Sequence, residues 1–220
     1  MDEKTKATVR ALLDRHPRGY AAEEADLTVT DSAAGLFRLL CLAILADDSV
    51  PSPGVTSAAR AMFDRRWISA EEMAKTEPGE RADVLRQAGY QQADQAARTL
   101  GEATDLVLHR YDGDLQNLRR AAHGNRDRLH ALLREIPGMD AAGCAVFLRE
   151  VQLLWPEAGP FVDDHATRAA ERLDLPTDPD RLLHDIARGG KTETLSWLVG
   201  ALALVDAHNE YPAIRQAAHH

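Results

Sequence analysis

The chain has 220 residues and a formal net charge of −9, enough length for one large domain or two lobes around a sizeable core. Only two cysteines are present, which excludes a disulfide framework and a four-cysteine metal or iron–sulfur site. No stretch approaches the roughly 18 apolar residues that span a bilayer, and the charged N-terminus lacks the apolar core of a signal peptide. We therefore expect a soluble, cytoplasmic protein without a membrane partner.

Apolar residues recur at helical spacing along almost the whole chain. Ala96, Leu100, Ala103 and Val107 follow one another at steps of three and four, and no segment alternates over the length of a strand. The segment 33–46 is apolar nearly all round, as in a central helix covered on several sides. Proline and glycine clusters separate the helical stretches. The pattern predicts an all-α protein of about ten helices.

The segment LREIPGMDAAGCAVFLREV, residues 133–151, contains two apolar helical runs around a tight turn. Pro137 ends the first run because it supplies no N–H, and Gly138 can adopt the positive φ that reverses the chain. The free backbone amides at the start of the second run form an anion site. An ordinary αα-hairpin of a helical bundle remains an alternative interpretation.

Farther along, GPFVDDHATRAAERLDLP (residues 159–176) places Asp163, Asp164 and His165 directly before a helical run. A single aspartate there is most simply an N-cap, whose carboxylate accepts hydrogen bonds from the first amides of the helix. The Ile-Pro-Gly hairpin followed by Val-Asp-x-His-x-x-Arg nevertheless resembles the helix-hairpin-helix DNA glycosylases, the superfamily of endonuclease III. The resemblance covers roughly residues 33–176.

The resemblance implies a fold of two helical lobes. One is a six-helix barrel carrying the hairpin, residues 30–147, and the second combines residues 1–29 with residues 148–220. Duplex DNA containing a damaged base would be the partner of a monomeric protein, nucleoid-associated if bacterial, with the target nucleotide flipped into the cleft.

The resemblance also assigns roles to particular residues. Asp163 takes the position of the catalytic aspartate, which stabilises positive charge on the sugar and orients the attacking water. Asp48, Asp164 and His165 become candidates for the base pocket or cleft. Relatives often bind a monovalent cation at the hairpin carbonyls. The DNA-phosphate contacts fall on the hairpin residues Pro137, Gly138, Met139, Asp140, Ala142 and Gly143.

The chain departs from the family pattern at several positions. Ala142 stands where bifunctional members carry a lysine nucleophile, so no Schiff base can form and no strand cleavage is expected. Asp140 replaces a hairpin glycine and brings a carboxylate to the phosphate site. Asp47 and Asp48 occupy the loop that probes the duplex in relatives, and the cysteine count excludes the iron–sulfur loop.

Two functional hypotheses follow. The first is a monofunctional DNA glycosylase, free of metal and cofactor, that hydrolyses the N-glycosidic bond of an alkylated or deaminated base. The second is a catalytically inactive helix-hairpin-helix module that binds DNA or protein. The overall negative charge disfavours nonspecific DNA binding. A local basic face remains compatible with the sequence, because arginines are concentrated at positions 119, 120, 126, 128 and 134.

Overall fold

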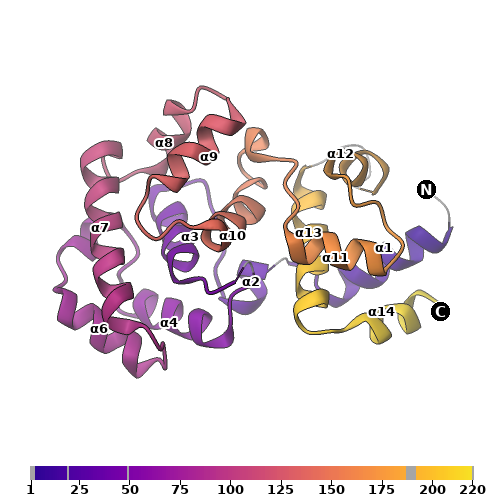
Figure 1. Ribbon diagram of the computed structural model, residues 1–220, viewed down its shortest axis with the longest axis horizontal. Helices are drawn as coiled ribbons and strands as arrows, with labels where there is room; N and C mark the ends of the chain where they lie inside the picture. Colours follow the sequence, from indigo (N-terminus) through magenta and orange to yellow (C-terminus); the bar gives the residue numbers. More distant parts are fainter. Residues whose placement is uncertain (1–2, 19, 49, 187–191, 220) are drawn as a thin grey trace. The chain divides into compact units, whose positions relative to one another are not determined.

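The computed structural model describes residues 3–18, 20–48, 50–186 and 192–219, and these residues form helices, turns and loops with no strand. The all-α prediction is therefore confirmed for the described chain (Figure 1). Helices α1 to α14 exceed the ten or so predicted because short ones such as α5 (Ala70–Ala74) and α12 (Pro179–Arg181) show no periodicity over their few residues. None of the described helices is long and apolar enough to cross a membrane.

The chain divides into two compact units. Unit 1 comprises Met1–Glu23 and Leu148–His220, and unit 2 comprises Glu24–Phe147. Helix α10 (Ala141–Val151) contributes its first residues to unit 2 and its last residues to unit 1.

Unit 2 is built around α3 (Ala33–Leu45), which forms where the apolar run predicts a central helix. Ser32 caps its N-terminus by accepting a hydrogen bond from the Gly35 amide at 3.1 Å. Helix α3 packs against α4, α7 and α8, and α6 lies along α7 (Figure 1). The other helices of this unit are α4 (Pro53–Asp64), α5, α6 (Pro78–Gln87), α7 (Ala93–Tyr111), α8 (Leu115–Ala121) and α9 (Arg126–Arg134).

Unit 1 is organised around α13 (Thr192–Ala207), most of whose described side chains from Leu195 to Val205 are buried. Helix α11 (Asp164–Arg172) packs on α13, and α1 (Glu3–Arg15) contacts both α13 and α14 (Tyr211–Ala218). The remaining elements are α2 (Tyr20–Glu24), the 3-10 turn η1 (Pro156–Ala158), α12 and the π-helical turn η2 (Leu182–Ile186).

A polar cluster fastens the end of α1 to the start of α14 in unit 1. Glu210 accepts hydrogen bonds from Arg15 at 2.5 Å and from His16 Nε2 at 2.7 Å. His16 Nδ1 lies 2.9 Å from Glu23. Hydrogen bonding from Arg15, opposed by partial burial and assisted by His16, lowers the pKa of Glu210 to about 2.

Candidate functional site

The predicted hairpin forms between α9 and α10 in unit 2. Gly138 has a φ of +83°, and the Met139 amide donates to the Ile136 carbonyl at 3.0 Å. A Cβ at Gly138 would lie 2.6 Å from the Thr99 methyl carbon and 2.8 Å from Ile44 Cγ2. Glycine is therefore required here both for the backbone conformation and for the space beside α7 and α3.

Asp140 caps the helix that follows the turn. Its Oδ1 accepts a hydrogen bond from the Gly143 amide at 3.0 Å, and its carbonyl accepts from the Cys144 amide at 3.0 Å. The Asp140 carboxylate thus takes one of the first-turn amides that an external phosphate would use. It also places a negative charge at the same helix end.

The other predicted hairpin residues differ in accessibility. Gly138 is exposed, Pro137 and Ala142 are half-buried, and Met139 points into the core of the unit with 4% of its surface exposed. Gly143 is buried against α3, since a Cβ there would lie 2.7 Å from the Ala43 carbonyl oxygen. Among the six predicted hairpin residues, only Gly138 and Asp140 are exposed.

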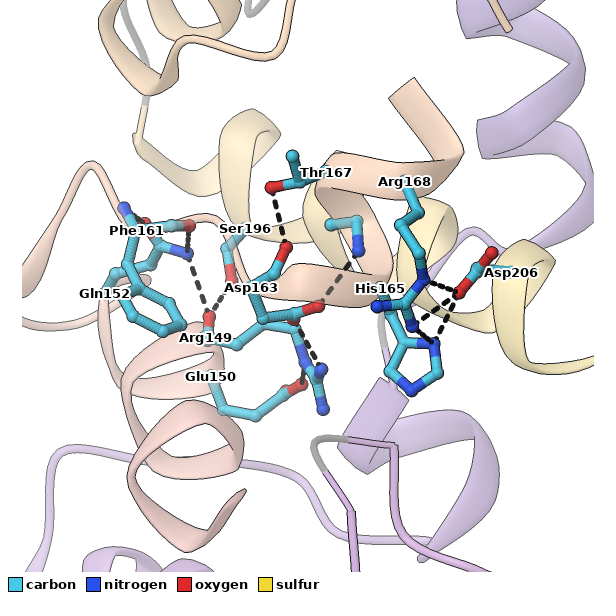
Figure 2. Close-up of polar contacts among 11 residues, drawn as sticks. Arg149, Glu150, Gln152, Phe161, Asp163, His165, Thr167, Arg168, Ser196 and Asp206 are labelled. Atoms are coloured by element: carbon cyan, nitrogen blue, oxygen red, sulfur yellow. Dashed lines mark hydrogen bonds and ion pairs between the residues drawn. The ribbon is translucent and has the colours of Figure 1, made fainter. Parts of the chain in front are cut away.

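Asp163 is the N-cap of α11 in unit 1, and both of its carboxylate oxygens are engaged. Oδ1 accepts from the Ala166 amide at 2.9 Å, and Oδ2 accepts from Arg149 Nη1 at 2.7 Å (Figure 2). Its backbone carbonyl accepts from the Thr167 hydroxyl at 2.9 Å. Only 3% of the residue is exposed. In this arrangement both carboxylate oxygens already accept hydrogen bonds from other groups of the protein.

Arg149, the partner of Asp163, is fully buried near the end of α10. Its Nε lies 3.4 Å from Glu150 Oε1, and its guanidinium lies 5.0 Å from the centroid of the Tyr20 ring. Burial alone would lower the pKa of Arg149, but Asp163 and Glu150 outweigh burial and raise it, so the guanidinium stays charged. Burial raises the pKa of Glu150, with Arg149 opposing the shift.

Sequence reasoning assigned no role to Arg149, although a signal was available. The residue stands in the mostly apolar stretch 146–155, next to Glu150, so it had to be buried with a partner. Which carboxylate it meets depends on the loop that brings Asp163 back to the end of α10. Gln152 orders that loop, because it accepts from the Phe161 amide at 2.9 Å and donates to the Phe161 carbonyl at 3.0 Å (Figure 2).

The three cleft candidates have different surroundings. His165 is largely buried, and its Nδ1 lies 2.6 Å from Asp206 Oδ2, which also accepts from Arg168 Nε at 3.0 Å (Figure 2). This contact joins α11 to α13. Asp164 is exposed on the first turn of α11. Asp48 is exposed after α3 and belongs to unit 2, so the candidates do not form one cluster within a unit.

The described residues were searched for grouped metal ligands and for activated thiols. No three His, Cys, Asp or Glu side chains among these residues are grouped to hold a metal ion. Cys41 and Cys144 are free and buried, and burial raises the pKa of both thiols, that of Cys144 to about 11. Neither is an activated thiolate.

The chain was compared with models of protein families and with curated proteins, and neither comparison found a match. The likeness to helix-hairpin-helix glycosylases therefore stays a prediction from motifs in the sequence.

Proposed function

We propose that this protein is a catalytically inactive helix-hairpin-helix module that binds duplex DNA. The observation that carries the proposal is the pairing of Asp163 with the buried Arg149 at 2.7 Å. In the family that the chain resembles, this carboxylate faces the reacting sugar. Here an arginine neutralises its charge and takes one oxygen, while the α11 amide takes the other. Because Arg149 already balances its negative charge, the Asp163 carboxylate would stabilise an oxocarbenium-like transition state only weakly.

The DNA-binding part of the proposal rests on the arginines of α8 and α9. Residues 119–143 contain five arginines against three carboxylates, although the whole chain has a net charge of −9. Arg134 and Arg128 are exposed on the helix that leads into the hairpin. Because Asp140 occupies a hairpin amide, these side chains, rather than the amides, would make most of the phosphate contacts.

The binding experiment uses a short fluorescent duplex and anisotropy at several salt concentrations. About four phosphate contacts predict a loss of roughly 100-fold in affinity between about 50 mM and 200 mM salt. Arg134→Gln should weaken binding and reduce the slope of log affinity against log salt by the equivalent of about one phosphate contact. Arg65 is an exposed arginine after α4, and Arg65→Gln should change neither quantity. No duplex affinity at low salt would refute the DNA-binding part.

Asp140→Asn tests the hairpin itself. Asparagine caps a helix as well as aspartate does, so the turn should persist while the charge next to the phosphate site disappears. We expect affinity for the duplex to rise about threefold to tenfold at low salt. Unchanged affinity, with the fold intact, would show that the hairpin does not approach the DNA.

The second candidate is a monofunctional glycosylase, and a specific observation favours it. Asp163 stands at the N-terminus of α11, the position that the resemblance gives to the catalytic aspartate, and its side chain is held there by hydrogen bonds from the Ala166 amide and from Arg149. A panel of duplexes with alkylated or deaminated bases, followed by alkali, distinguishes the two candidates. Alkali-labile sites that Asp163→Asn abolishes would establish the glycosylase and overturn the inactive module.

A further inference from the structure

A cavity of about 220 Å³ lies in unit 1, between the first turns of α1, the end of α11 and α14. Its volume is below the range of about 300–1,000 Å³ typical of pockets for drug-sized ligands. It has no part in the hairpin or in the surroundings of Asp163. Its charged lining combines four basic side chains with a single carboxylate, and these are Lys4, Arg172, Arg215, His219 and Asp174.

The charges around the cavity leave an excess of two positive charges when His219 is neutral. Lys4 pairs with Asp174 at 2.9 Å, so these two cancel. Arg172 and Arg215 then remain, in a chain whose overall charge is strongly negative. Outside the lining, Asp206 Oδ1 lies 3.9 Å from Arg172 Nη1, and the Asp206 carboxylate is also paired with Arg168 and His165.

Both arginines are held in place by the fold. The Arg172 guanidinium lies 5.0 Å from the centroid of the Tyr211 ring. Arg215 Nη2 donates to the Arg172 carbonyl at 2.9 Å, which ties α14 to the end of α11. Each guanidinium carries five N–H donors, more than these contacts use. A guanidinium can bind a phosphate group through two parallel N–H···O hydrogen bonds.

The floor of the cavity is apolar. Leu173 and Ile214 line it and are almost fully buried, with 6% and 1% of their surfaces exposed. Ala218 adds a methyl group near the end of α14. A ligand that fits this lining carries a doubly charged head at the arginines and a compact apolar group over the floor.

We propose that this cavity binds a small phosphomonoester. The phosphate dianion matches the net charge of +2 that the lining carries when His219 is neutral, and the esterified group packs on Leu173 and Ile214. A free metabolite and the phosphorylated 5′ end of a nucleic acid share this chemistry. The site is independent of the proposed duplex binding, because its residues lie in unit 1 and the hairpin arginines lie in unit 2.

Calorimetric titration of the full chain with phenyl phosphate at low salt tests the proposal. We expect one binding site, no measurable binding of phenol, and weaker binding of inorganic phosphate. Arg215→Gln should weaken phenyl phosphate binding about tenfold or more, since it removes a charge-assisted contact. Arg10→Gln, an exposed arginine of α1 outside the cavity, should leave binding unchanged.

A second pair of variants tests the proposal even if Arg215→Gln fails to fold. Ala218→Glu adds a carboxylate to the lining near the end of α14 and should abolish binding, while the isosteric Ala218→Gln should retain most of it. Equal behaviour of Ala218→Glu and Ala218→Gln, or no binding of phenyl phosphate to the unmodified chain, would overturn the proposal.

Two further ligands identify the source of the phosphomonoester. A short single-stranded oligonucleotide with a 5′-phosphate is compared with the same oligonucleotide ending in a 5′-hydroxyl. A preference for the phosphorylated end that Arg215→Gln removes would assign the site to nucleic-acid ends. Binding of phenyl phosphate alone would assign it to a small metabolite.

Discussion

The buried pair of Arg149 and Asp163 makes a quantitative prediction about the stability of unit 1. We consider two substitutions, Asp163→Asn and Arg149→Met, and their combination. Asparagine keeps the cap on α11 but removes the charge, and methionine fills much of the arginine's volume without a charge. Removing one partner of a buried ion pair costs about 3–5 kcal/mol, because the other charge is left without compensation.

The surroundings of the pair place each substitution within that range. After Asp163→Asn, Arg149 still has Glu150 at 3.4 Å, so the loss in the free energy of unfolding should be about 3 kcal/mol. After Arg149→Met, both Asp163 and Glu150 lose their cation, and the loss should be about 5 kcal/mol. The double variant should lose at least about 2 kcal/mol less than the sum of the two.

Urea unfolding followed by tryptophan fluorescence measures these losses. In a Trp67→Phe background the two other tryptophans, Trp155 and Trp197, both belong to unit 1, so the signal reports on that unit. Arg168→Met is the matched control. Arg168 is 46% exposed, and its pairing with Asp206 should contribute less than about 1 kcal/mol. A coupling energy below about 0.5 kcal/mol between Arg149 and Asp163 would refute the reasoning.

Three further predictions concern other sites. Gly138→Ala should lower the free energy of unfolding, measured in urea, by about 2–4 kcal/mol, because the new Cβ would clash with Thr99 and the backbone has a positive φ. The control Gly124→Ala also has a positive φ, but its Cβ meets no atom within 4 Å, so the loss should be only about 1–2 kcal/mol. As the pH falls from 4.5 toward 2, the free energy of unfolding should decrease, because folded Glu210 resists protonation; Glu210→Gln should make this dependence shallower. Iodoacetamide should modify Cys144 at neutral pH only after unfolding, as mass spectrometry would detect.

The sequence by itself determined the features that depend on neighbouring residues. The helical periodicity predicts α3 and α7, and Pro137 with Gly138 predicts the reversal between α9 and α10. The capping interpretation of Asp163 rests on the same local chemistry, and the structure bears it out. These features are readable because helix periodicity, caps and tight turns involve partners within a few positions of one another.

The tertiary structure alone decided which charges meet. Arg149 and Asp163 are 14 residues apart, on separate elements, and nothing in the motif around Asp163 indicates that a buried arginine faces it. The basic cavity joins residues from both ends of the chain, Lys4 and Arg215, with Arg172. Ion pairs and cavities depend on how helices pack against one another, and a one-dimensional pattern contains that information only in part.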